Sequence, residues 1–117
     1  MTAETTNTIT VTSMDHFEKL LKESDVPVLF DFFAPWCGPC QDLEPVLEKI
    51  AANYAGRLIV AKINVEDHGA IADEAGVEAV PLTVLGAGGE LQVGIEGFDP
   101  ETGEQELREI VGEYVQG

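Results

Sequence analysis

The stretch Asp31-Phe32-Phe33-Ala34-Pro35-Trp36-Cys37-Gly38-Pro39-Cys40 decides how this chain folds and what chemistry it carries. An apolar run at residues 26–30 leads into it, and apolar residues at helical spacing follow it. If Cys37 begins a helix, one turn brings both sulfur atoms to the same edge. Unpaired backbone N–H groups and the positive end of the helix dipole then favour a thiolate at Cys37. We therefore predict that Cys37 is the acidic, reactive thiol and that Cys40, one turn further along, is more buried.

Length and composition predict one domain. The chain has 117 residues, of which 44% are hydrophobic. No apolar run approaches the roughly 20 residues that a membrane span requires. Residues 1–7 are polar and lack the features of a signal peptide. We expect a flexible tail at 1–7, a single domain at 8–117, no membrane association and a cytoplasmic, reducing location.

The chain is strongly acidic. It has 22 aspartate and glutamate residues against 6 lysine and arginine residues, a formal net charge of −16. Such a charge argues against nucleic acid and anionic membranes as partners. Two interpretations remain open: a solvated acidic surface in an ordinary protein, or adaptation to high salt, where screening removes the repulsion between carboxylates.

Cys37 and Cys40 are the only cysteines in the chain, and several roles are open to them. They could be an inert buried pair or half of a zinc site. Tetrahedral zinc needs about four ligands, however, and His16 and His68 are not spaced to complete such a set. In a reducing compartment a close cysteine pair is more often catalytic or metal-binding than a structural cross-link. We favour redox chemistry: Cys37 attacks a substrate disulfide, and Cys40 then attacks Cys37 and releases the reduced product.

The remaining pattern predicts an α/β protein with a mixed sheet. Strands are expected at 8–11, 26–33, 58–65, 82–85 and 91–95, the second and third being buried because they are almost wholly apolar. Helices are expected after a cap at Thr12 or Ser13, from Cys37 to about Tyr54, at 70–75 and near the C terminus. The glycine-rich residues 86–89 predict a hairpin turn. Together these elements give the order β-α-β-α-β-α-β-β-α.

The sequence Trp36-Cys37-Gly38-Pro39-Cys40, following Asp31-Phe32-Phe33-Ala34, resembles the active site of the thioredoxin family. The resemblance extends from about Ile9 to the C terminus. It implies a thioredoxin fold, with a mixed five-stranded β-sheet flanked by four helices. It also implies thiol–disulfide exchange through Cys37 and Cys40.

Two charged residues in apolar surroundings are further candidates. Asp31 is the one charge in its predicted strand, so loss of hydration should raise its pKa. Lys62 is the only cation in the next predicted strand. The resemblance implies that Asp31 accepts the proton of the resolving thiol Cys40, with Lys62 beside it. The alternative is a purely structural Asp–Lys pair, although such pairs rarely add stability when buried.

By the same resemblance, a shallow apolar surface around the cysteines should bind the substrate. Pro81 would be a cis-proline, and the preceding Val80 would offer backbone hydrogen bonds to an extended substrate. The expected surface consists of Trp36, Gly38, Pro39, Val80, Pro81 and Gly97. The chain departs from the usual family pattern at Phe33, Gln41, Leu82-Thr83, Gly86 and the loop at 98–103. These departures bear on partner specificity, not on the dithiol chemistry.

The function expected from the resemblance is a general protein-disulfide reductase that acts on disulfide-containing target proteins. It would be a monomer and would bind no cofactor or metal. A thioredoxin reductase would recycle it, either a flavoprotein that uses NADPH or a ferredoxin-linked enzyme. The alternatives are an oxidase or isomerase of the same superfamily, and a non-catalytic subunit with this fold.

Overall fold

A computed structural model of the chain describes residues 7–115. Its strands are β1 (Thr8–Thr10), β2 (Val28–Phe33), β3 (Ile59–Asn64), β4 (Leu82–Ala87) and β5 (Glu90–Glu96). Its helices are α1 (Met14–Glu23), α2 (Gly38–Asn53), α3 (Gly69–Ala75) and α4 (Gly103–Tyr114). The predicted tail lies outside the described residues except for Asn7, whose backbone N–H donates to a side-chain oxygen of Glu48.

The strands of the described chain form one mixed sheet in the order β1-β3-β2-β4-β5. β1 and β2 each pair with β3 in parallel, whereas β4 runs antiparallel to β2 and β5 antiparallel to β4. β2 is therefore central, and five of its six residues are buried, as its apolar sequence predicts. The predicted fold class, a mixed five-stranded sheet with four helices, is confirmed.

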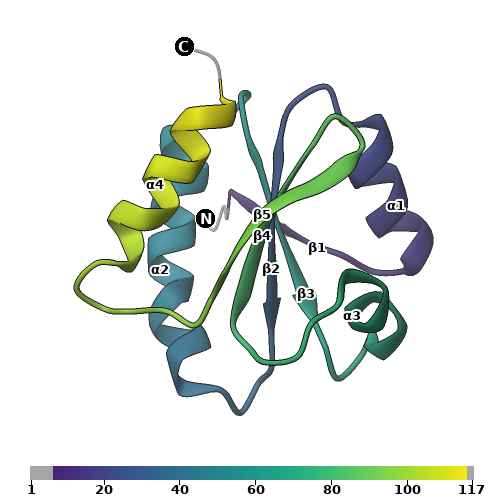
Figure 1. The fold of residues 1–117 in the computed structure, drawn as a ribbon, viewed down its shortest axis with the longest axis horizontal. Coiled ribbons are helices and arrows are strands. Elements are labelled where there is room, and N and C mark those ends of the chain that lie inside the picture. The colour runs from purple at the N-terminus through teal and green to yellow at the C-terminus, as the bar shows by residue number, and fades with distance from the viewer. Residues whose placement is uncertain (1–6, 116–117) are drawn as a thin grey trace, which may run out of the picture.

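Helices cover both faces of the sheet, α2 and α4 on one side and α1 and α3 on the other (Figure 1). Successive residues of β2 point to opposite faces, so Leu29 joins the core beneath α2 and α4 while Phe30 and Phe32 join the core on the side of α1. Asp31 lies two residues after Leu29, so its side chain points to the same face of the sheet. The one charged side chain of this strand is therefore directed to the side of α2.

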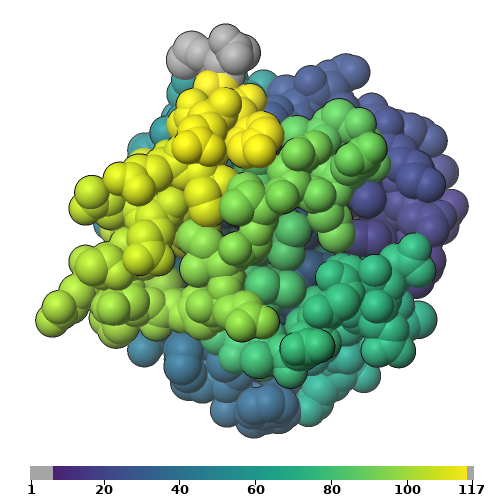
Figure 2. All heavy atoms as spheres, viewed as in Figure 1, coloured from purple at the N-terminus to yellow at the C-terminus, as the bar shows by residue number. Residues whose placement is uncertain are grey.

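The chain segments that contain the predicted site residues lie together at one edge of the sheet. The register places Phe32 opposite Leu82, and Leu82 opposite Glu96. Consequently the loop after β2, the residues before β4 and the residue after β5 all lie at this edge. In Figure 2 the segment that joins β2 to α2 reaches the surface at the lower edge, beside the segment that contains α3.

The predicted turn at 86–89 is partly wrong, because Gly86 and Ala87 belong to β4 and only Gly88 and Gly89 form the turn. A Cβ atom at residue 86 would lie 2.8 Å from Cδ1 of Leu21 and 3.1 Å from Cε2 of Phe30. Gly86 therefore lets the side chains of α1 and β2 pack directly on the strand. Gly88 and Gly89 have φ angles of 66° and 87°, which suit the tight turn.

The remaining boundaries agree closely with the expected ones. Ser13 caps α1 by accepting the backbone N–H of His16, and Gly76 ends α3 in a left-handed conformation. The second strand begins at Val28, two residues later than expected, after Pro27. None of the helices within residues 7–115 is long and apolar enough to cross a membrane.

Candidate active site

Cys37 is the N-cap residue of α2, and Gly38 and Pro39 form the first turn of the helix. Its Sγ accepts the backbone N–H of Cys40, with an N–S distance of 3.2 Å. Proline fits this turn because its missing N–H would have no partner there. The N–H donor and the helix dipole both stabilise negative charge on this sulfur, so the geometry favours a thiolate at Cys37 once the pair is reduced.

Cys37 and Cys40 form a disulfide across this first turn, with a Cα–Cα distance of 5.3 Å. The expected difference in burial is wrong, since 5% of Cys37 and 6% of Cys40 is exposed. Both cysteines pack with Ala34 and against the half-buried Phe33, Val65 and Val80. What distinguishes the two sulfurs is therefore the position of Cys37 at the helix terminus.

Asp31 is 1% exposed, and its Oδ1 accepts no hydrogen bond from the described part of the chain. Burial raises the pKa of Asp31 to about 7, although the nearby Lys62 ammonium opposes this rise; the Glu44 carboxylate adds to it. A cavity of about 190 Å³ is lined by both Asp31 and Cys40. The structure thus brings together the buried acid and the second cysteine, with room for water at the same cavity.

Lys62 lies opposite Asp31 in the β2–β3 register, as predicted. Its Nζ does not pair with Asp31, however; it forms an ion pair with Oε2 of Glu44. The sequence prediction missed Glu44. Glu44 follows Cys40 by four residues and therefore lies on the same helix face, so helical spacing alone could have identified it.

Trp36 is 69% exposed and does not belong to the core. Its Nε1 donates to Oε2 of Glu66, a partner that the sequence prediction also missed. Glu66 follows β3 just as Trp36 follows β2, and the carboxyl ends of parallel strands meet at one edge of a sheet. Trp36, Gly38 and Pro39 present an exposed surface around the buried disulfide.

Val80 and Pro81 are joined by a cis peptide bond, as the resemblance implied, and lie just ahead of the first paired residue of β4. The carbonyl oxygen of Pro81 accepts the backbone N–H of Gly97 at 2.7 Å. Val80 also contacts the cysteine cluster, and with Trp36 it lines a cavity of about 230 Å³. All six residues predicted for substrate binding thus lie at the edge of the sheet that holds the disulfide.

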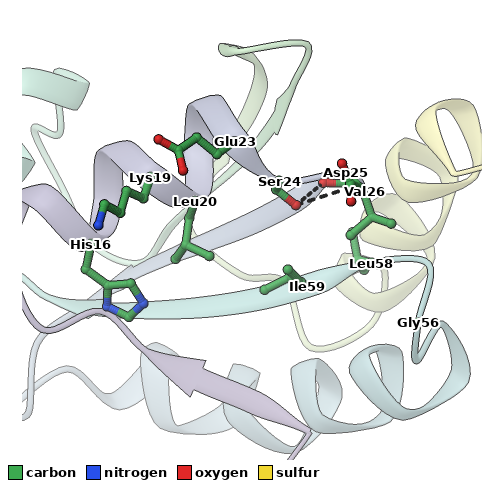
Figure 3. A pocket seen from close by; sticks show the side chains of 10 residues that line it. All are labelled: His16, Lys19, Leu20, Glu23, Ser24, Asp25, Val26, Gly56, Leu58 and Ile59. Carbon is green, nitrogen blue, oxygen red and sulfur yellow. Dashed lines mark hydrogen bonds between the residues drawn. The ribbon is translucent and has the colours of Figure 1, made fainter.

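A larger hollow, of about 590 Å³, lies at the opposite ends of β2 and β3, beside α1 (Figure 3). Leu20, Leu58 and Ile59 form apolar parts of its wall, and a hydrogen bond joins Ser24 to the carbonyl of Val26. His16 lines this hollow, at the ends of β2 and β3 that lie away from the cysteines. No group of three or more His, Cys, Asp or Glu residues within 7–115 is arranged to hold a metal ion.

Comparison with known proteins agrees with this geometry. The family model described as Thioredoxin matches residues 8–111. The chain belongs to the thioredoxin family. It is 35% identical over 99 residues to a thioredoxin of Haemophilus influenzae, covering 85% of this chain and 90% of that protein. It is 38% identical over 86 residues to thioredoxin 1 of a Nostoc species, covering 74% of this chain and 80% of the relative.

A solved structure of a thioredoxin variant from Halobacterium salinarum superposes with a TM-score of 0.83 at 33% identity, covering 99% of this chain and 98% of the other. The predicted thioredoxin fold is therefore confirmed. Family membership and the Cys37–Cys40 disulfide together make this chain a thiol–disulfide oxidoreductase with one redox-active cysteine pair.

Proposed function

We propose that this thioredoxin-family protein is a general protein-disulfide reductase that acts on disulfides of target proteins. The observation that carries the proposal is the position of Cys37. Its sulfur caps α2, accepts the Cys40 N–H and lies within an otherwise exposed segment. This arrangement favours a nucleophilic thiolate in the reduced protein, and such a thiolate begins disulfide reduction.

The reaction transfers two electrons in two exchange steps. The Cys37 thiolate attacks one sulfur of the target disulfide, so that a mixed disulfide forms and the other target sulfur leaves as a thiolate. Cys40 then loses its proton and attacks Sγ of Cys37. The second target sulfur leaves, the target is reduced to a dithiol, and the Cys37–Cys40 disulfide forms.

Asp31 is the proposed acceptor for the Cys40 proton. The two residues line the same cavity, so a water molecule there could carry the proton between them. The raised pKa of Asp31, about 7, is suited to proton transfer near neutral pH. Target proteins would bind in extended form along Val80, as an added strand, with their side chains on Trp36, Gly38, Pro39, Pro81 and Gly97.

The disulfide form must be reduced again before the next cycle. We infer that a thioredoxin reductase does this, so that NADPH and flavin, or a ferredoxin-linked centre, belong to the reductase. This chain would need no cofactor of its own. The protein would be a monomer in the cytoplasm, and its acidic surface would not bind nucleic acid.

The test is reduction of insulin disulfides by the reduced protein, compared with a variant in which both cysteines are serine. We expect rapid reduction by the wild type and none above background by the variant. Equal rates would contradict the proposal and favour a non-catalytic subunit. An oxidase or isomerase would instead show a reduction potential nearer −120 to −180 mV, well above the roughly −270 mV of a reducing member.

A further inference from the structure

The side chains of Glu44 and Lys62 lie between two cavities on the α2 side of the sheet. The inner cavity is lined by Asp31 and Cys40, and the outer one by Thr8, Thr10 and Glu48. Glu44 and Lys62 line both. The ion pair between them therefore stands at the boundary of the space that the proposed proton transfer uses.

Two contacts fix the Lys62 ammonium at this boundary. Its Nζ is paired with Oε2 of Glu44 and lies 5.3 Å from the centre of the Phe33 ring, where a cation is attracted to the aromatic face. The Lys62 side chain is 16% exposed and that of Glu44 54%. The ammonium is thus drawn toward solvent, although Lys62 is the register neighbour of Asp31.

Within residues 7–115, no hydrogen bond to Oδ1 of Asp31 compensates for the burial of this carboxyl group. Lys62 faces it from β3, Glu44 and Cys40 face it from α2, and its register neighbour on β4 is Thr83, which does not titrate. With Oδ1 unpaired within the described chain, the ionised form of Asp31 would attract Lys62 strongly. Glu44 competes with it for the same ammonium.

We propose that Glu44 is a positioning residue, which holds the Lys62 ammonium away from Asp31 and so keeps the buried carboxylate available as the proton acceptor for Cys40. If Glu44 were neutral, Lys62 would be free to turn inward and pair with Asp31. The paired carboxylate would be a weaker base and a poorer acceptor for the thiol proton. The inference rests on the proposed function for its catalytic consequence but not for its geometry.

The first experiment measures the titration of the Asp31 carboxyl carbon by NMR in the disulfide form, in which neither cysteine titrates. In Glu44→Gln we expect the midpoint to fall by about one pH unit, since an opposite charge close to a carboxylate lowers its pKa by that order. Glu48→Gln is the matched control. Glu48 lies one turn further along α2 and bonds Thr8, so its loss should leave the midpoint unchanged.

A second arm separates positioning of Lys62 from simple repulsion between Glu44 and Asp31. In a Lys62→Gln background, Glu44→Gln should move the midpoint by less than half as much as in the wild type, because no ammonium remains to be released. An equal shift in both backgrounds would overturn the positioning role. So would an unchanged midpoint in Glu44→Gln.

The third arm measures the rate at which Cys40 resolves a preformed mixed disulfide, from pH 5 to 9. In Glu44→Gln the acid limb of the profile should move to lower pH together with the Asp31 midpoint, and the plateau should fall. A shifted midpoint with an unchanged rate profile would overturn the catalytic part of the inference. The NMR arms need no substrate, so their outcome is independent of whether the wild type reduces insulin.

Discussion

At the scale of single residues, the most unusual group is the buried acid Asp31, which should reduce stability near neutral pH. Its folded pKa of about 7 lies above the unfolded value of about 3.9. The native state therefore holds the proton more tightly, and its stability falls as pH rises from about 4 to about 7. The rise of the pKa to about 7 corresponds to a loss of at most about 4 kcal/mol in the free energy of unfolding once both states are ionised.

Asp31→Asn removes that ionisation, so the variant should be more stable than the wild type above pH 7 by about 2–4 kcal/mol. The difference should shrink toward pH 4. Urea unfolding midpoints across pH 4 to 9 measure it, with Asp42→Asn, an exposed carboxylate of α2, as the control that should show no such trend. The same Asp31 variant should reduce disulfides more slowly. A less stable variant with an unchanged rate would make Asp31 a structural residue only.

At the scale of elements, the packing of α1 and β2 on β4 depends on the absence of a side chain at Gly86. Gly86→Ala should destabilise the protein by about 1–3 kcal/mol, because the new methyl group would displace the partly buried side chain of Leu21 and the buried ring of Phe30. Gly112→Ala is the control. Gly112 lies in α4 with open space around it, so alanine should stabilise the protein by about 0.5–1 kcal/mol. The melting temperatures of both variants test this prediction. An unchanged melting temperature in Gly86→Ala would contradict the packing explanation.

Gly86 also shows why element boundaries were harder to predict than elements. Every strand and helix was expected from the sequence, the clearest being the apolar run of β2 and the long helical pattern of α2. A glycine cluster, in contrast, is typical of a turn, and only the three-dimensional packing of Leu21 and Phe30 explains why its first member lies in a strand.

Some features of the site were likewise predicted from the sequence, and others were not. The roles of Cys37 and Cys40 were predicted from the spacing of the motif, whereas the position of Lys62 beside Asp31 was predicted from the family resemblance and agrees with the register of β2 and β3. The burial of the cysteines was mispredicted, because the surrounding residues bury Cys37 and Cys40 to nearly the same extent. Glu66 was missed because it is distant in sequence from Trp36, which it contacts, and Glu44 was missed although its helical spacing from Cys40 places it on the face of α2 that carries Cys40. In an acidic chain no single carboxylate stands out.

At the scale of the whole molecule, the net charge of −16 should make stability depend on salt. At about 0.1 M the Debye length is roughly 10 Å and repulsion between surface carboxylates persists, whereas at about 1 M it is roughly 3 Å. We expect the melting temperature to rise with KCl into the molar range. A flat profile would contradict this.

The matched control for the salt prediction replaces three exposed carboxylates on different helices, Glu18→Gln, Glu74→Gln and Glu113→Gln. Lower net charge leaves less repulsion to screen, so the triple variant should show a shallower rise of melting temperature with KCl. An identical slope would attribute the salt effect to exclusion of salt from the protein surface instead of screening.

The central claim is that Cys37 attacks and Cys40 resolves. The most direct measurement is the mass of the covalent adduct formed when single-cysteine variants meet a disulfide-bonded peptide at pH 7. Cys40→Ser should accumulate a mixed disulfide through Cys37, because the resolving thiol is absent, whereas Cys37→Ser should form little adduct in the same time. Equal adduct formation, or faster adduct formation through Cys40, would contradict the assignment of the two sulfurs.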